Sequence, residues 1–205
     1  MSANCVQPPE QVLVIPTSLA ALICPNTWGP VPEGAENDIL NAHTWRDREE
    51  AETNFDFKQV IPYIVVTWSN LYLLSQRTTQ QQEKRLHGKF SIGQGGHINN
   101  MDFHGSAGYL TNTITREIAE EYTLSEILAC EPVGVINDNS TEVARVHLGL
   151  VYLMRVVSPE FCVAETDKHT AKWADIDEVR RHYDQMESWS QVLLDNLFTK
   201  PPSSP

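Results

Sequence analysis

The order of apolar and polar runs along the chain predicts strands first, then a helix, then further strands and two closing helices. The β-rich runs "QVIPYIVVTW" and "LYLLSQR" are separated only by "SN", which predicts a hairpin with a tight polar turn. The run "KFSIGQGGHI" predicts a short strand that ends in glycines, and the runs on either side of "NDNS" predict two more strands. This order of elements predicts an α/β fold with a mixed sheet and helices on both faces.

The clearest helical pattern lies in the middle of the chain. One apolar face recurs there at every fourth position, through Leu110, Ile114, Ile118 and Tyr122. The segments "DIDEVRRHYDQM" and "SWSQVLLDNLF" predict the closing helices, and Ser188 or Ser190 is expected to cap the second one.

The first fifty residues are less regular. The run "QVLVIPTSLAALI" predicts an apolar strand that is broken or redirected at Pro16. The stretch "CPNTWGPVPEGAEN" is rich in turn residues and predicts a loop, and "HTWRDREEAETN" predicts a short helix or loop on the surface. The first ten residues and the tail "TKPPSSP" are polar or rich in proline, so both ends are expected to be disordered.

Charge and composition narrow the range of partners. The formal net charge is -12, from 27 acidic residues against 15 Lys and Arg, so neither nucleic acid nor an anionic membrane is expected as a partner. No apolar run reaches the roughly 18–20 residues that span a bilayer. The N-terminal stretch lacks the basic and apolar regions of a signal peptide, which predicts a cytoplasmic protein. Reduced, mostly buried thiols are expected at the four cysteines, Cys5, Cys24, Cys130 and Cys162.

The stretch "ITREIAEEYTL" places like charges close together near the end of the predicted helix. Glu117, Glu120 and Glu121 fall within a stripe about 100° wide. Each i,i+3 or i,i+4 pair of like charges costs a few tenths of a kcal/mol, and the helix dipole disfavours acids at this end. A divalent cation such as Mg²⁺ or Mn²⁺ would compensate, because carboxylate oxygens are its preferred ligands. The competing interpretation is an exposed acidic face without a catalytic role.

Together with the upstream "GQGGHINNMD", this helix resembles the Nudix hydrolase motif G-x5-E-x7-R-E-U-x-E-E-x-G-U, in which U is aliphatic. The second half is matched by Arg116, Glu117, Ile118, Glu120, Glu121 and Leu124. The resemblance implies that the three glutamates bind catalytic metal ions and that Arg116 orients a glutamate through a salt bridge. Asp102 stands where the motif has its first glutamate, thirteen residues instead of seven separate it from Arg116, and Thr123 replaces the late glycine.

The resemblance covers roughly residues 55–198, from "FKQVIPYIVV" to "ESWSQVLL", and includes "KWADIDEV" near the end. Within the family, the chain resembles a subgroup of bacterial Nudix proteins that are described only as predicted phosphoesterases. It implies a Nudix α/β/α sandwich over residues 55–198. Residues 1–54 are then expected to form an N-terminal extension packed on this core, and residues 199–205 a disordered tail.

Further candidates surround the motif. Gly95 and Gly96 would let the backbone approach a metal–phosphate site, because glycine has no Cβ. His97 is a candidate for contact with substrate, although a structural histidine is the competing interpretation. Arg77, Lys84 and Arg85 are candidates for neutralising substrate phosphates, or are ordinary solvated charges. The remaining candidates are Asp138 or Glu142 as a general base and His147 as a satisfied strand histidine near the substrate.

The resemblance implies metal-dependent hydrolysis of a phosphoanhydride (pyrophosphate) bond in a nucleoside diphosphate-linked or related small molecule. The expected cofactor is Mg²⁺ or Mn²⁺, and a homodimer is compatible with the family. The implied catalytic residues are Glu117, Glu120 and Arg116, and the implied metal ligands are Glu117, Glu120, Glu121 and Asp102. The alternative is a catalytically inactive Nudix module that binds a nucleotide or protein partner, which the long loop and Asp102 favour. A diphosphate isomerase is a weaker third hypothesis, since no cysteine or glutamate is placed to support it.

Overall fold

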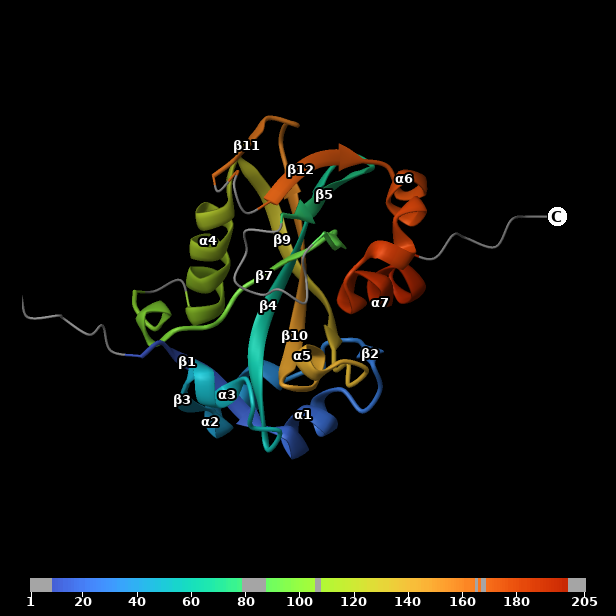
Figure 1. Cartoon of the computed structure of the whole chain (residues 1–205). Helices are drawn as coiled ribbons and strands as arrows, with labels where there is room; N and C mark the ends of the chain where they lie inside the picture. The colour runs from blue at the N-terminus through green and yellow to red at the C-terminus, as the bar shows by residue number, and fades with distance from the viewer. Residues whose placement is uncertain (1–8, 79–87, 106–107, 165, 167–168, 199–205) are drawn as a thin grey trace, which may run out of the picture.

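The computed structural model describes residues 9–78, 88–105, 108–164, 166 and 169–198, and it is built on one large mixed sheet (Figure 1). The main path of the sheet runs β12 (His169–Ala174), β5 (Leu71–Arg77), β4 (Phe57–Trp68), β10 (His147–Val156), β9 (Ile127–Ile136) and β2 (Trp28–Gly29). The central strands β4 and β10 are parallel, while the other neighbours on this path are antiparallel. The predicted mixed sheet is confirmed.

Four further strands extend the sheet away from this path. They are β1 (Gln11–Pro16), which pairs with β4 and with β3 (Thr44–Asp47), β6 (Phe90–Ser91), which pairs with β5, and β7 (Gln94–Gly95), which pairs with β4. A separate two-stranded sheet joins β8 (Tyr122–Leu124) to β11 (Phe161–Val163). The single strand predicted for "KFSIGQGGHI" is therefore two short strands, each paired with a different neighbour.

Helices cover both faces of the sheet, as the sequence predicts. Side chains alternate along a strand, so successive residues of β4 enter different cores. Ile64 and Val66 pack with the helix α4 (Tyr109–Glu121). Tyr63 and Val65 pack on the opposite face with α7 (Ser188–Asn196). Figure 1 shows α4 on one side of the sheet, with α7 and α6 (Ile176–Arg181) on the other.

The predicted hairpin joins β4 to β5. Thr67 pairs with Tyr72 and Trp68 with Leu71, which leaves a two-residue turn. Ser69, the first residue of that turn, has a φ of 54°, the left-handed conformation that suits tight hairpin turns. The polar "SN" therefore forms the turn that the pattern indicates.

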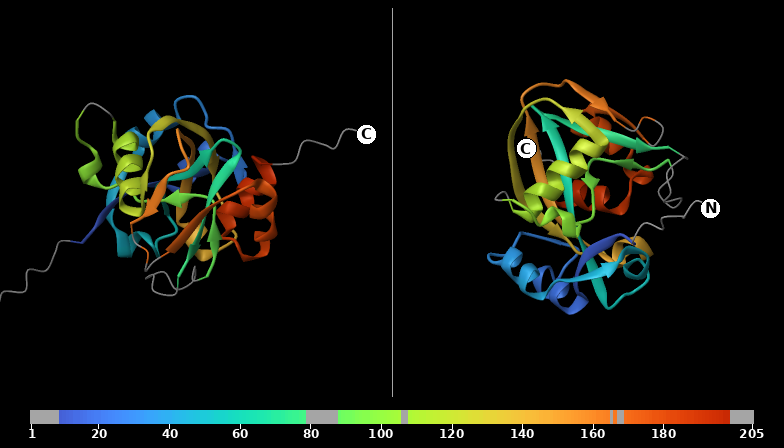
Figure 2. Two further views of the ribbon diagram at one scale, coloured as in Figure 1. Left: turned by 90° about the horizontal axis from the view of Figure 1, so that it is seen from above. Right: turned by 90° about the vertical axis from the view of Figure 1, so that its left-hand side faces the viewer.

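The N-terminal segment contributes strands to the main sheet, because β1 pairs with β4 and β2 pairs with β9. β1 ends at Pro16 and the helix α1 (Thr17–Ile23) follows at once, so the chain is redirected where the sequence predicts. Leu13 and Ile15 are fully buried in a cluster with side chains of β4 and β10. In the right-hand view of Figure 2 this segment lies beneath the rest of the molecule, together with α2 (Ala35–Ala42) and α3 (Arg48–Ala51). The boundary between residues 54 and 55 stays a prediction.

Three further local predictions fail in the fold. The segment 43–54, predicted as a short helix or loop, begins with the strand β3, which pairs with β1. The segment 24–37 is not all loop, because Trp28 and Gly29 pair with β9 and α2 begins at Ala35. No serine side chain caps α7: its N-cap is Glu187, and the buried Ser190 instead accepts a hydrogen bond from the Ile92 backbone N–H at 3.1 Å. Tertiary contacts outweigh the local preference in each case.

The cysteine prediction is partly wrong. Of the three cysteines in the described ranges, all free, Cys24 is buried, Cys130 is half-buried and Cys162 is exposed on β11. Cys5, the first eight residues and the predicted tail 199–205 lie outside the described residues. No helix in the described part of the chain has the length and apolar character to cross a membrane.

Candidate active site

The three glutamates of α4 line one large cavity of about 1130 Å³. Their environments differ, because the side chains of Glu117 and Glu121 are 13% and 17% exposed, whereas that of Glu120 is 57% exposed. The Glu121 carboxylate lies 3.1 Å from Nδ1 of the buried His169. The predicted acidic stripe thus faces a cavity, and two of its three members are largely shielded from water.

Glu117 lies against residues 91–97, called here the glycine-rich segment. An ideal Cβ added to Gly96 would lie 1.7 Å from the Glu117 Cδ, so any larger residue would displace this carboxylate. Burial raises the pKa of Glu117 to about 7, although the neighbouring Arg116 opposes that change. Gly93 has a similar steric role beside the ring of Tyr63, where a Cβ would lie 2.2 Å from Cε1. Gly93 and Gly96 of "GQGG" must therefore be glycine, because the Tyr63 ring and the Glu117 carboxylate occupy the space that a Cβ would need.

Arg116 connects the parts of the site through hydrogen bonds to Glu117, to the backbone of His97 and to Asp102. Its Nη1 donates to Glu117 at 2.6 Å and approaches Glu120 at 3.4 Å. Its Nη2 donates to the backbone carbonyl of His97 at 2.8 Å, which ties α4 to the glycine-rich segment. The same guanidinium also donates two hydrogen bonds to Asp102, from Nε at 3.0 Å and from Nη2 at 2.8 Å.

Asp102 reaches this site despite the longer loop. It ends a short 3₁₀ helix, Asn100–Asp102, and its carboxylate also accepts the backbone N–H of Asn99 at 2.8 Å. Burial by itself would raise the pKa of Asp102, but the hydrogen bonds from Arg116 and Asn99 outweigh it and lower the pKa below its ordinary value. Both carboxylate oxygens are engaged, so the geometry gives Asp102 the role of holding Arg116. Metal ligation by Asp102 stays a prediction.

This geometry can be compared with known proteins. No protein-family model matches the chain. It is 33% identical to Protein YmaB of Bacillus subtilis (strain 168) over 156 residues, which are 73% of this chain and 76% of YmaB. It also matches the crystal structure of Tm1382, a candidate Nudix hydrolase, with a TM-score of 0.76 and 28% identity over 92% of this chain and 98% of Tm1382.

The chain belongs to the Nudix superfamily. It is an enzyme of the Nudix pyrophosphohydrolase type. The fold alone is also shared with the Nudix domain of Shewanella oneidensis NrtR, at a TM-score of 0.53 and 16% identity over 69% of this chain and 86% of that one.

Most of the other predicted residues of this Nudix enzyme line the same cavity. They are Arg77 at the end of β5, Gly95 in β7, and His97. Arg85, like Lys84, lies outside the described residues. Burial lowers the pKa of His97 well below its ordinary value, so its ring is neutral near pH 7. Substrate binding by these residues stays a prediction.

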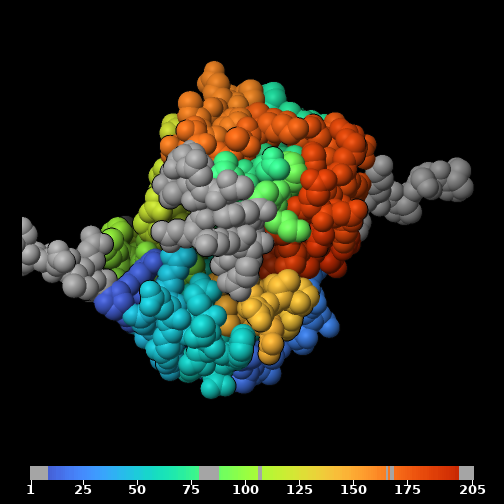
Figure 3. Space-filling view, viewed as in Figure 1, coloured from blue at the N-terminus to red at the C-terminus, as the bar shows by residue number. Residues whose placement is uncertain are grey.

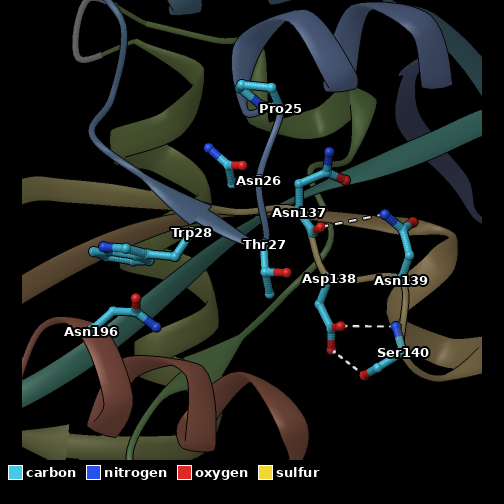
Figure 4. A pocket seen from close by; sticks show the side chains of 9 residues that line it. All are labelled: Pro25, Asn26, Thr27, Trp28, Asn137, Asp138, Asn139, Ser140 and Asn196. Carbon is cyan, nitrogen blue, oxygen red and sulfur yellow. Dashed lines mark hydrogen bonds between the residues drawn. The ribbon is translucent and has the colours of Figure 1, made fainter.

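The two candidates for a general base lie in different cavities. Glu142 lines the cavity of the glutamate helix. Asp138 lines a separate cavity of about 610 Å³ with Trp28 and Asn196. Figure 4 shows the Asp138 carboxylate turned toward Ser140, from which it accepts hydrogen bonds at 2.8 Å (backbone N–H) and 3.0 Å (hydroxyl). Asp138 is thus engaged in its own turn and away from the α4 glutamates.

Sequence reasoning missed Glu187, which lines the cavity, and the buried Lys58, which is not among its lining residues. Glu187 accepts hydrogen bonds from Ser91 at 2.5 Å and from Tyr63 at 2.6 Å, a network that joins α7 to the glycine-rich segment. Lys58 is 1% exposed and donates to the backbone carbonyl of His147 at 3.2 Å, and burial lowers its pKa to about 8. A lysine inside the apolar run "FKQVIPYIVV" is the one sequence signal that could have indicated it.

Proposed function

We propose that this Nudix protein hydrolyses a pyrophosphate bond in a nucleoside diphosphate-linked or related small molecule, with Mg²⁺ or Mn²⁺ as cofactor. One observation carries the proposal: three carboxylates of a single helix face one cavity, with Glu117 packed against Gly96 and paired with Arg116. Such an arrangement of like charges is costly on a helix unless something compensates it.

The donor set fits a hard divalent cation. Glu117, Glu120 and Glu121 offer oxygen ligands, which Mg²⁺ and Mn²⁺ prefer. The raised pKa of Glu117 reflects burial of its charge, and a nearby cation would favour the ionised form. When bound, the ion would neutralise the pyrophosphate and lower the pKa of an attacking water.

Side chains of the protein would position the ligands, accept a proton and bind the substrate phosphates. Arg116 positions Glu117 through the 2.6 Å contact and is itself held by Asp102. Glu120, the most exposed of the three glutamates, or Glu117, whose pKa is about 7, would accept a proton from the attacking water. The cationic side chains of Arg77 and Lys89 border the cavity, where they would bind substrate phosphates.

The geometry removes the main reason for the inactive alternative. The long loop and the Asp102 substitution suggested that the first acidic residue of the motif is misplaced. Asp102 instead accepts two hydrogen bonds from Arg116, so the acidic residue before the helix reaches the arginine of the motif despite the longer loop. No observation among the described residues favours a pure binding module.

ADP-ribose is a rational first substrate to assay. It is bound to the Nudix domain of NrtR in its cocrystal structure, and it contains the phosphoanhydride linkage that we propose is cleaved here. The cytoplasmic location, the absence of nucleic-acid and membrane partners, and the possible homodimer stay predictions.

The test is turnover with and without Glu120→Gln. The full chain is incubated with Mg²⁺ or Mn²⁺ and a panel of ADP-ribose, dinucleoside polyphosphates, nucleotide sugars and NTPs, and the products are quantified. Glu131→Gln is a matched control, because Glu131 is an exposed glutamate that also pairs with an arginine, Arg155, at 3.3 Å. We expect Glu120→Gln to lower kcat by at least about 100-fold, since about 3 kcal/mol of transition-state stabilisation would be lost. Equal turnover in both variants, or none across the panel for the unmodified protein, would refute the proposal.

A further inference from the structure

A second group of metal-binding side chains lies in the wall of the same cavity. Glu52 directly follows α3, His97 follows β7, and His147 begins β10. One ligand atom from each lies within 4.8 Å of the other two. Figure 3 shows α3 and α5 (Glu142–Arg145), the helices that precede Glu52 and His147, on the same face of the molecule.

The spacing within this group does not match direct hydrogen bonds. Glu52 Oε1 lies 4.0 Å from His97 Nε2 and 3.9 Å from His147 Nε2, beyond the range of an N–H···O hydrogen bond. Two ligands about 2.1 Å from one tetrahedral ion lie about 3.4 Å apart. A shift of about half an ångström by the Glu52 carboxylate, which is 29% exposed at the end of a short helix, would bring its oxygen to that distance from each histidine nitrogen. The ligand atoms of the two histidines lie within 4.8 Å of each other.

A hydrogen bond orients one of the two histidine rings, that of His147. The Nδ1–H of His147 donates to the backbone carbonyl of Val143 at 2.6 Å, because a carbonyl oxygen can only accept. This bond fixes the tautomer and leaves a lone pair on Nε2, which lies 3.9 Å from Glu52 Oε1, as in metal sites where a carbonyl orients the ligand. The Nε2 of His97 is buried and has no hydrogen-bond partner among the described residues, which is costly unless a further group satisfies it.

We propose that Glu52, His97 and His147 bind a transition-metal ion of the Zn²⁺ or Co²⁺ class, at a site separate from the three glutamates of α4. Two imidazoles and one carboxylate favour such ions, whereas an all-carboxylate set favours Mg²⁺ and Mn²⁺. The site borders the substrate cavity and leaves room for a further ligand, so the ion would attract an anionic group there.

The site also links distant parts of the chain. Glu52 comes from the N-terminal segment, and the backbone carbonyl of His97 accepts a hydrogen bond from Arg116. The ion would therefore fasten the N-terminal segment to the same glycine-rich segment that supports Glu117. We expect its binding to raise the Tm of the full chain.

The experiment uses Co²⁺ as a coloured probe for the Zn²⁺ site. The full chain is freed of metal with a chelator and titrated with Co²⁺ while the visible absorption is recorded, and Zn²⁺ is then added to displace the cobalt. We expect one equivalent of Co²⁺ to give a visible band that Zn²⁺ removes. Glu52→Gln and His97→Gln should each weaken Co²⁺ binding by at least about 100-fold, because each removes one of only three protein ligands.

Two control variants make the result specific. Glu50→Gln alters the neighbouring helix α3 at an exposed residue that pairs with Arg46, and Glu120→Gln alters the glutamate helix. Both should retain the cobalt band, and circular dichroism should show that every variant is folded. The inference is overturned if the unmodified chain gives no band at millimolar Co²⁺, or if Glu52→Gln or His97→Gln binds Co²⁺ within threefold of it. These outcomes do not depend on turnover, so they are independent of the proposed hydrolase activity.

Discussion

Replacing Asp102 with asparagine tests whether this residue is the anchor of the active site. The substitution keeps the size of the side chain and removes its charge. Arg116 donates to both carboxylate oxygens, so in Asp102→Asn one of its N–H donors would face an amide N–H instead of an acceptor. The side chain of Asp102 is 3% exposed, and water cannot easily replace what is lost.

The magnitude follows from the burial of the pair. Breaking a buried ion pair by removal of one partner costs about 3–5 kcal/mol. Arg116 is 24% exposed and keeps its contacts with Glu117 and the His97 carbonyl, so the cost should be smaller. We expect a loss of about 2–3 kcal/mol in the free energy of unfolding, which corresponds to a fall in Tm of about 4–12 °C for a chain of this size.

The assay is urea unfolding at several pH values, with Asp195→Asn as the matched control. Asp195 is an exposed aspartate that accepts one hydrogen bond from Tyr183, so its substitution should cost less than about 0.5 kcal/mol. The pKa of Asp102 is lowered from its ordinary value of 3.8, so its stabilising effect is present above pH 3.8 and is lost as the pH falls through the lower folded value. The gap between wild type and Asp102→Asn should therefore be full at pH 7 and close in strong acid.

Two results would refute this reasoning. One is a stability of Asp102→Asn at pH 7 within 0.5 kcal/mol of the Asp195→Asn control, which would mean that the pair with Arg116 contributes nothing. The other is a gap that stays constant down to pH 2, which would mean that the charge of Asp102 is not its cause.

Two further predictions concern Glu117. Gly96→Ala should lower Mg²⁺-dependent turnover by at least about 100-fold, because its Cβ would occupy the position of the Glu117 Cδ. The control Gly29→Ala should leave turnover unchanged, because its Cβ would meet only Cys24 Sγ at 3.6 Å. Full activity in Gly96→Ala would contradict the packing of Glu117 against Gly96. The second prediction concerns stability in the presence of a chelator. Because the pKa of Glu117 is raised to about 7 in the folded state, the free energy of unfolding of the wild type should be greatest below pH 4.5. Relative to Glu117→Gln, it should fall by up to about 3 kcal/mol as the pH rises to 8. Denaturant unfolding measures both curves, and parallel curves would show that Glu117 is not buried as described.

Short-range patterns were sufficient for much of the fold and for one half of the site. The hairpin around Ser69 and the helix carrying the glutamates follow from periodicity and turn chemistry, which act over a few residues. The resemblance to the Nudix motif implied that Gly96 and Glu117 belong to one site, and the structure has Gly96 against the Glu117 carboxylate. The capping of α7 could not be predicted, since Ser190 contacts Ile92 across the core.

The sequence by itself determined that this is a Nudix chain with an acidic helix on an α/β sheet, because those signals are local. Only the tertiary structure decided where Asp102 lies, because a longer loop costs little extra closure entropy and its length does not specify where its residues end up. The same holds for Glu52, His97 and His147, which are 45 and 50 positions apart along the chain and meet only when the sheet is assembled. No local pattern encodes such a meeting, since it depends on which strands pair and on how the N-terminal segment packs against them.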